Sequence, residues 1–317
     1  MPTVALTAVL LLGLSEGAET PVPVAVTEST APQEMTEVAV VAPEPRFVAP
    51  TRRDRIGRIW APVEINGQGP FRLVLDTGAS HSALTARVAE KLGIPVPYPG
   101  KTILRGTTGT TTVPMIPIRT LEVGDLLMEP RRLPIIPDAL GGAEGILGTD
   151  GLAGKRIHID FRGDRITIVR SRNERAPSGF VTIPVKFMRG HLLVVDAYLG
   201  GVRTKAIIDT GGQATLGNVA LREALARRRS GTVAVTDNVV GATLDVQTGD
   251  RVATPAIAMG DVLVRNAAMT FADFVIFEHW KMIQEPAMLI GMDVLGLLDT
   301  LIIDYRRREL QVRLRRS

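Results

Sequence analysis

The chain has 317 residues, 45% hydrophobic and 22% charged, a balance typical of soluble globular proteins rather than of disordered chains or membrane bundles. It contains no cysteine, which excludes disulfides, thiol catalysis and thiolate metal sites. The net charge of +4 comes partly from arginine clusters at 227–229, 306–308 and 313–316. Because no aromatic residues interleave with these arginines, we interpret them as solvated faces and a tail, and expect no nucleic-acid partner.

The first residues form an apolar run, Val4 to Leu14, followed by the small residues Ser15 and Gly17. This resembles a secretory signal peptide, so we assign residues 1–18 to one and expect a periplasmic or secreted protein. No Lys or Arg precedes Arg46, so a disordered apolar start or a misplaced initiation site is the alternative. Residues 19–55 are rich in Pro, Thr, Val and Glu, which predicts an extended linker or a prosegment.

From residue 56 onward, short apolar runs alternate with Gly, Asn, Asp and Pro, which predicts mostly antiparallel β-structure. Two patches have helical spacing: Ala83 to Leu92, closed by Gly93, and Val219 to Arg228, closed by Gly231. The long apolar stretch from Met288 to Tyr305 contains three aspartates. We therefore interpret it as core strand and turn, and expect no stable membrane span.

The chain then shows the same series of features twice. LVLDTGAS at 73–80 and AIIDTGGQ at 206–213 each follow an expected β-hairpin, with an Asn-Gly or a Gly-Gly turn. Each is followed, in the same order, by a glycine-bearing segment, a Gly-Asp turn, an apolar-apolar-Gly triplet and an Asp-aromatic pair. The sequence thus predicts a duplicated all-β fold, with halves at 56–175 and 176–317 packed about a pseudo-two-fold axis.

An Asp at the end of a strand, followed by Thr and Gly, places a carboxylate at a tight loop. Two such loops related by an axis can bring Asp76 and Asp209 into contact. Two carboxyl groups about 3 Å apart do not both ionise easily and share a proton. The ionised group can then take a proton from a water while the protonated group donates to a carbonyl oxygen, which is the acid–base work of amide hydrolysis.

These loops, with the triplets Ile146-Leu147-Gly148 and Leu289-Ile290-Gly291, resemble aspartic proteases, specifically the retropepsin-like type found in bacteria. The resemblance covers about residues 57 to 317. It implies an aspartic endopeptidase acting on an extended peptide, without a metal or another cofactor. It also implies a monomer, because the two halves form a dimer-like pair within one chain.

Carried over residue by residue, the resemblance implies that Asp76 and Asp209 are the catalytic dyad. Thr77 and Thr210 would interlock across the axis, and Gly78 and Gly211 would let the loops approach closely. Two flaps would close on the substrate and offer backbone hydrogen bonds. The expected flap residues are Gly106, Thr107, Thr108, Gly109, Val240, Gly241 and Ala242.

The second loop departs from the family pattern at Gly212 and Gln213, which leaves three alternatives: a working asymmetric dyad, a second half kept as scaffold, or first halves paired between two chains. The corresponding runner-up function is a peptide-binding module with impaired catalysis. Ala79 and Gly212 stand where pepsin-like enzymes carry a Ser whose hydroxyl stabilises the ionised Asp. Losing that donor should raise the pKa of the dyad and move the pH optimum nearer neutrality than pepsin's.

The remaining candidate residues favour structural roles. His81 follows Ser80, but no Gly-x-Ser-x-Gly elbow surrounds them, and neighbours in sequence seldom face each other as base and nucleophile. The other histidines lie far apart without metal-ligand spacing, at 158, 191 and 279. Four aspartates recur with the repeat and are expected to form turn or surface hydrogen bonds: Asp150, Asp160, Asp293 and Asp304.

Overall fold

The computed structural model describes residue 58 and residues 60–96, 99–124, 126–138, 140–189, 192–228 and 233–315. Nearer the amino terminus it gives the backbone of three short strands, β1 (Thr3–Ala5), β2 (Val9–Leu11) and β3 (Val38–Val41). Apart from these strands, the segments assigned to a signal peptide and a linker lie outside the described residues, so both assignments stay predictions. The described part consists mainly of strands with a few short helices, which confirms the predicted all-β class.

The first half forms one sheet, in which β1 joins nine strands in the order β1-β7-β8-β11-β6-β12-β5-β4-β9-β10. Helix α1 (Ala86–Lys91) follows β6 directly. The strands are β4 (Trp60–Ile65), β5 (Gln68–Leu75), β6 (Ala83–Thr85), β7 (Lys101–Arg105), β8 (Thr110–Ile118), β9 (Leu121–Val123), β10 (Leu126–Met128), β11 (Arg131–Ile136) and β12 (Gly145–Leu147).

The second half forms a sheet in the order β2-β20-β21-β24-β19-β25-β18-β17-β22-β23-β3, with β16 (Lys186–Met188) on β17. Its helices are α2 (Val219–Ala226), α3 (Val275–His279) and α4 (Met292–Leu295). Its other strands are β17 (Leu192–Leu199), β18 (Val202–Ile208), β19 (Leu216–Gly217), β20 (Ala234–Gly241), β21 (Val246–Ala253), β22 (Ile257–Met259), β23 (Val262–Arg265), β24 (Ala268–Phe271) and β25 (Ala287–Ile290). From β7 to β10 and from β20 to β23, the two orders correspond strand by strand. The predicted duplication is therefore a duplicated sheet.

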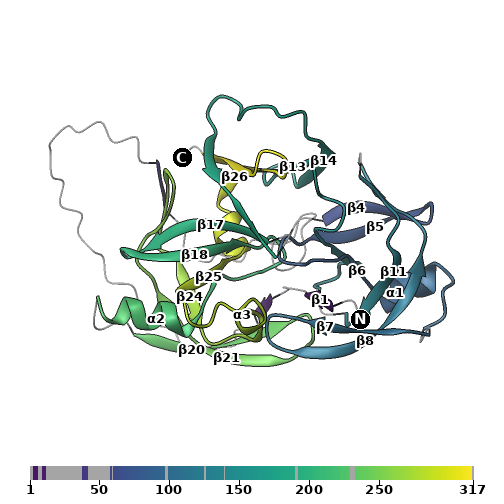
Figure 1. The fold of residues 1–317 in the computed structure, drawn as a ribbon, viewed down its shortest axis with the longest axis horizontal. Coiled ribbons are helices and arrows are strands. Elements are labelled where there is room, and N and C mark those ends of the chain that lie inside the picture. Colours follow the sequence, from purple (N-terminus) through teal and green to yellow (C-terminus); the bar gives the residue numbers. More distant parts are fainter. Residues whose placement is uncertain are drawn as a thin grey trace.

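A third sheet joins the halves, in the order β14-β13-β26-β27-β15. Its strands are β13 (Lys155–Asp160), β14 (Arg165–Arg170), β15 (Val181–Pro184), β26 (Leu298–Asp304) and β27 (Glu309–Leu314). In Figure 1 it lies at the top, opposite the hairpins β7–β8 and β20–β21 at the bottom. Because β13 of the first half pairs antiparallel with β26 of the second, the sheet fixes the two halves to each other.

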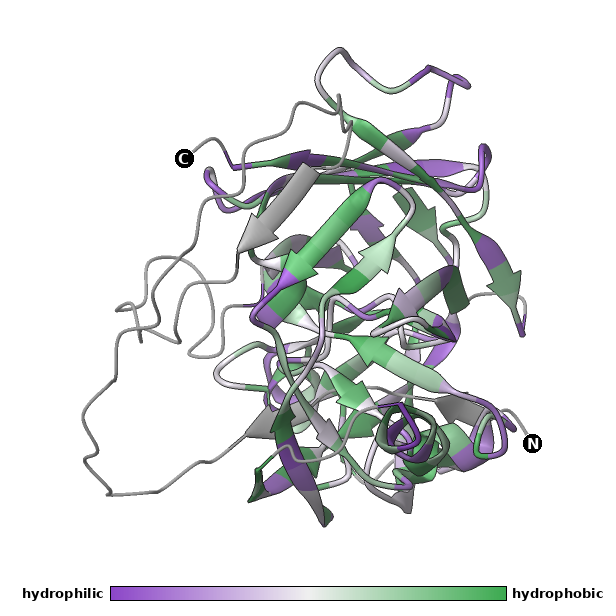
Figure 2. Cartoon of the chain, turned by 90° about the vertical axis from the view of Figure 1, so that its left-hand side faces the viewer, coloured by the Kyte–Doolittle hydropathy of each residue, from purple (hydrophilic) through white to green (hydrophobic). Residues whose placement is uncertain are grey.

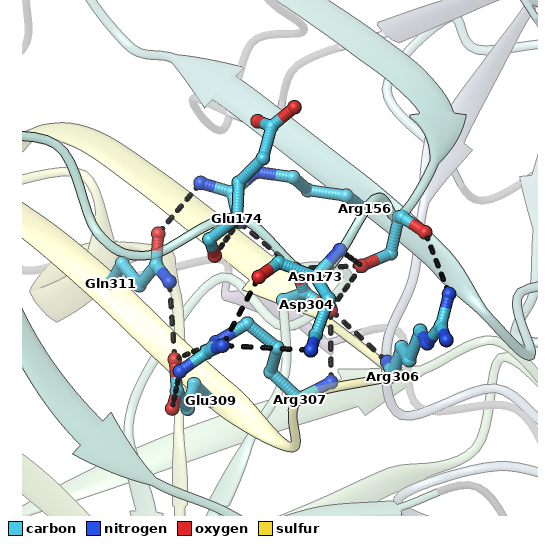
Figure 3. Close-up of polar contacts among 9 residues, drawn as sticks. Arg156, Asn173, Glu174, Asp304, Arg306, Arg307, Glu309 and Gln311 are labelled. Atoms are coloured by element: carbon cyan, nitrogen blue, oxygen red, sulfur yellow. Dashed lines mark hydrogen bonds and ion pairs between the residues drawn. The ribbon is translucent and has the colours of Figure 1, made fainter.

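An ion pair crosses this shared sheet at the junction of the halves (Figure 3). Arg156 Nη1 donates to Asp304 Oδ2 at 2.9 Å, and the Asp304 side chain is fully buried. Ser171 Oγ donates to the same carboxylate at 2.9 Å, and Arg156 Nη2 donates to Gln311 Oε1 at 2.7 Å. Both partners of the pair thus make further hydrogen bonds, which is the condition under which a buried ion pair is tolerated.

The hairpin turns that lead to the two Asp-Thr-Gly loops have the conformation their sequences require. Asn66 and Gly67 have φ of 53° and 73°, and Gly200 and Gly201 have φ of 56° and 80°. Left-handed backbone at both central residues is typical of the two-residue turns that match strand twist. These turns set the register of β4 on β5 and of β17 on β18, and so position the strands that end at the aspartates.

The two helical patches are shorter than expected from sequence. Ala83 to Thr85 form strand β6, because this segment bonds to β12 on one side and β11 on the other, and the helix begins only at Ala86. In the second half α2 begins after Asn218, whose side chain accepts a hydrogen bond from Leu221 N. Residues 288–305 hold the expected core strands but also the short helix α4.

Hydrophobic residues, green in Figure 2, follow the strands inside both halves, while hydrophilic residues gather at the turns. One core cluster contains buried residues of both halves, among them Leu73, Leu147, Ile208 and Ile290. Burial of such side chains stabilises each by about 1.5–3 kcal/mol relative to exposure. In the described residues, no helix combines the length and the apolar character that crossing a membrane requires.

Candidate active site

The two aspartates predicted as the dyad lie at equivalent places, one residue beyond the ends of β5 and β18. Each strand pairs in parallel with the strand of the apolar triplet, β12 or β25. Asp76 N donates to Leu147 O at 2.9 Å, and Asp209 N donates to Ile290 O at 3.0 Å. The triplets therefore lie beside the loops and fix where each aspartate leaves its strand.

Each loop holds its own carboxyl group with backbone donors. Asp76 Oδ1 accepts from Gly78 N at 2.8 Å and Ala79 N at 3.0 Å. Asp209 Oδ1 accepts from Gly211 N at 2.9 Å and Gly212 N at 3.0 Å. The second loop thus makes the same contacts as the first, despite its different sequence after the Asp-Thr-Gly.

The two threonines interlock across the axis. Thr77 N donates to Thr210 Oγ1 at 3.2 Å, and Thr210 N donates to Thr77 Oγ1 at 3.1 Å. Each hydroxyl in turn donates to a carbonyl oxygen of the opposite half, Ile208 O at 2.6 Å and Leu75 O at 2.7 Å. These four buried bonds couple the loops into one rigid unit.

The carboxyl groups lie within hydrogen-bonding reach of each other and are fully buried. Gly211 makes this approach possible, because a Cβ at that position would overlap the Asp76 carboxyl group. Apart from the contact between the two carboxyl groups, Oδ2 of each aspartate accepts no hydrogen bond from an N–H or O–H group of the described residues. These oxygen atoms are therefore the ones available for proton sharing and for a bound reactant.

Burial raises the pKa of both carboxyl groups, and the charge of Asp76 raises that of Asp209 further. Burial raises the pKa of Asp76 to about 6, although hydrogen bonds from Asp209, Gly78 and Ala79 and the charge of Arg58 oppose the rise. Burial, the charge of Asp76 and the hydrogen bond to Asp76 raise the pKa of Asp209 well above its usual value, against the donors Gly211 and Gly212. The pair therefore holds one proton over a range of pH in which isolated aspartates hold none.

The expected flap residues meet at the tips of the hairpins β7–β8 and β20–β21. Thr108 Oγ1 donates to Asp245 O at 2.7 Å and accepts from Gly241 N at 2.9 Å. Thr107 is fully buried, and its carbonyl oxygen accepts from Ile276 N at 3.2 Å.

The other expected flap residues shape the two tips. In the first flap, Gly106 N donates to Gly109 O at 2.9 Å and closes the tip. In the second flap, Ala242 is buried in the core cluster of the first half. Val240 pairs with Val246 and so belongs to the strands of the second flap. The flaps are thus hydrogen-bonded to each other rather than held apart.

A family model described as aspartyl protease matches the chain twice, at residues 61–150 and 195–294. The chain belongs to the aspartyl protease family. The two matches confirm the predicted resemblance and its tandem halves. No curated protein matches the chain.

Gly212, one of the two departures from the family pattern, has a steric reason. A Cβ at this position would lie 2.8 Å from Asp209 Oδ2 and 3.1 Å from Leu289 Cδ2, closer than side chains normally pack. In the first half Ala79 carries a Cβ at the equivalent position and is fully buried. Gln213, the other departure, contacts the start of α4 through its backbone: its carbonyl oxygen accepts from Asp293 N at 3.0 Å.

Two carboxylates of the repeat support the segments that follow the dyad loops, as the expected turn or surface hydrogen bonds: Asp150 is partly exposed and Asp293 is exposed. Asp150 accepts from Ser82 N at 2.9 Å and Ser82 Oγ at 2.8 Å. Asp293 accepts from Thr215 N at 2.9 Å and Thr215 Oγ1 at 2.7 Å. The signal was present in the repeat, because Ser82 and Thr215 both stand six residues after the dyad aspartates.

The histidines lie apart from the dyad chemistry. Ser80 Oγ and His81 Nδ1 are 3.0 Å apart, so the expectation that these neighbours do not face each other is wrong. His158 lies on β13, and burial lowers its pKa. His279 ends α3, and His191 lies outside the described residues. Among the described residues, no three His, Cys, Asp or Glu side chains come together as a metal site.

Proposed function

We propose that this protein is an aspartic endopeptidase that hydrolyses peptide bonds of an extended protein substrate, in the periplasm or outside the cell. The observation that carries the proposal is the contact of two buried carboxyl groups, Asp76 and Asp209, held by equivalent backbone donors on two interlocked loops. Their raised pKa values indicate that they share a proton.

In this mechanism the ionised carboxylate takes a proton from a water molecule, whose oxygen attacks the peptide carbonyl carbon. The protonated carboxyl group donates its proton to the carbonyl oxygen, which forms a tetrahedral gem-diol. When the C–N bond breaks, the departing nitrogen takes the proton of the carboxyl group that had acted as base, and a gem-diol hydroxyl gives its proton to the other carboxylate as the new carboxylic acid forms. The dyad thus returns to its singly protonated state. The interlocked threonines keep both carboxyl groups in place, so little reorganisation accompanies the proton transfers.

An extended substrate suits the edges of the flap strands. In the structure, β1 pairs in parallel with β7, from Thr3↔Ile103 to Ala5↔Arg105, and β2 pairs antiparallel with β20, from Val9↔Gly241 to Leu11↔Val239. Both flap strands thus take an additional strand. Strand addition of this kind supplies affinity through backbone hydrogen bonds, with specificity left to the side chains.

The test is cleavage of an unbiased peptide mixture by the full chain between pH 3 and 8, with Asp76→Asn and Asp209→Asn beside the wild type. We expect either replacement to abolish turnover. Asp261→Asn, at an exposed turn, is the matched control and should retain it. Because the reactive dyad needs one ionised group, turnover should rise as the pH passes through about 6 and fall again once Asp209 ionises.

The other outcomes separate the alternatives. Cleavage that survives Asp209→Asn but not Asp76→Asn would show that first halves pair between chains. Binding of peptides without cleavage by the wild type would contradict the peptidase and favour a binding module.

A further inference from the structure

Arg58 is a buried cation beside the dyad, and no sequence motif predicted a role for it. It is 1% exposed, and its Nη1 donates to Gly211 O, in the second loop, at 3.3 Å. The same glycine presents its Cα to the Asp76 carboxyl group. Arg58 therefore comes from the first half, contacts the second loop and lies close to Asp76.

In the described residues, the equivalent position of the second half carries a hydrocarbon side chain in place of this cation. In the first half Trp60 pairs with Val74, so the register continued by two residues sets position 58 opposite Asp76. In the second half Val194 pairs with Ile207, and the same continuation sets position 192 opposite Asp209. Position 192 is a leucine, which is fully buried. Equivalent positions thus hold a guanidinium beside one carboxyl group and a hydrocarbon side chain beside the other.

Three ionisable side chains of the described residues act on the Asp76 carboxyl group or respond to it. Asp209 contacts it from the second loop, and Arg58 acts on it from the segment before β4. Tyr305, at the turn after β26, is buried, and its pKa is raised by burial and by the charge of Asp76. Asp209 favours the ionised form of Asp76 through its hydrogen bond, and Arg58 favours it through its charge, because a nearby cation stabilises the ionised form of a carboxyl group.

We propose that Arg58 is a positioning residue that makes the dyad asymmetric: it directs the negative charge to Asp76 and leaves the shared proton on Asp209. The assignment of catalytic roles rests on the proposed peptidase function: Asp76 acts as the base toward water and Asp209 as the acid toward the carbonyl oxygen. The placement of the charge itself does not depend on turnover.

Three replacements separate the charge of Arg58 from its hydrogen bond. Arg58→Lys keeps a cation, Arg58→Gln keeps a donor for the Gly211 carbonyl oxygen without a charge, and Arg58→Met removes both. The first readout is ¹³C NMR titration of the aspartate carboxyl carbons in the full chain, with signals assigned through Asp76→Asn and Asp209→Asn. The second is the pH profile of kcat/KM on a peptide cleaved by the wild type.

We expect Arg58→Gln and Arg58→Met to move the Asp76 titration upward by about one pH unit, and Arg58→Lys to leave it near that of the wild type. The acidic limb of kcat/KM should move equally, which is about a tenfold loss on that limb. If Arg58→Met does not fold, as judged by circular dichroism, Arg58→Gln decides. If kcat/KM fell equally in Arg58→Lys and Arg58→Gln while the Asp76 titration stayed in place, the proposal would be overturned and Arg58 would have a structural role. A shifted titration in a protein that cleaves no peptide would refute the peptidase but not the charge placement.

Discussion

Replacing Asp76 by Asn should stabilise the folded protein at neutral pH. The pKa of Asp76 rises from 3.8 to about 6 on folding, mainly through burial, a difference of about two pH units. At about 1.4 kcal/mol per unit, the ionised group costs roughly 3 kcal/mol of stability once the pH is above about 6. Asn resembles the protonated carboxyl group and carries no such cost. The pKa of about 6 already includes the effect of the Arg58 charge, which opposes the rise in the pKa of Asp76.

The sign of the pH dependence follows from the raised pKa. A carboxyl group that binds its proton more tightly when folded stabilises the fold at low pH, and this contribution is lost as the pH rises through the folded pKa. The difference between Asp76→Asn and the wild type should therefore be near zero below pH 4, grow between pH 4 and 6, and stay constant above. For a folded region of this size, 3 kcal/mol corresponds to roughly 6–12 °C in Tm.

The assay is thermal unfolding by circular dichroism at pH 3.5, 5 and 7, with Asp304→Asn as a control of opposite sign. Burial alone would raise the pKa of Asp304, but hydrogen bonds from Arg307 N, Ser171 Oγ and Arg156, with the Arg156 charge, outweigh it and lower the pKa. Its contribution is present above the unfolded pKa and lost in acid, so Asp304→Asn should destabilise most at pH 7. A Tm of Asp76→Asn below that of the wild type at pH 7, or a difference independent of pH, would refute the reasoning.

Two further replacements test the loops and the flaps. Gly212→Ala should lower kcat at least tenfold, because the added Cβ would lie 2.8 Å from Asp209 Oδ2. Ala79→Gly, at the equivalent position of the first loop, should lower kcat less than threefold. Equal kcat values for the two variants would contradict this steric difference. Thr108→Val removes a hydroxyl that hydrogen-bonds to the second flap at two points, so amide hydrogen exchange at the flap tips should accelerate about tenfold. Thr112 is exposed on the same hairpin, and Thr112→Ala should leave this exchange unchanged.

Features with a local sequence signature could be predicted before the structure. The Asn-Gly and Gly-Gly turns, the strand-ending aspartates and the order of the repeated features led directly to the duplicated sheet, because each depends on neighbours in the chain. The short strand β6 was missed for the opposite reason. Its backbone bonds to β11 and β12, strands distant in sequence, and these bonds override the helical spacing of Ala83 to Thr85.

The supporting groups of the site were also hidden from local reasoning. Asp150 and Asp293 stand in segments rich in turn signals, and the residues that donate to them, Ser82 and Thr215, are distant in sequence. Arg58 precedes β4, close to the start of the first half predicted from residue 56, where the sequence showed no motif. Its burial depends on contact with the other half, which no pattern around residue 58 expresses.

The same contact shows what a fused duplication offers to the chemistry. In a dimer of identical subunits every residue near the axis appears twice, so both carboxyl groups have the same neighbours. Here the halves share one frame but differ beside the dyad, with Arg58 against Leu192 and Ala79 against Gly212. The acid–base mechanism proposed for this dyad requires its two carboxyl groups to be in different protonation states at the same moment. A single chain can encode that difference permanently in the residues beside each carboxyl group, while the interlocked threonines keep the geometry of the two loops equal.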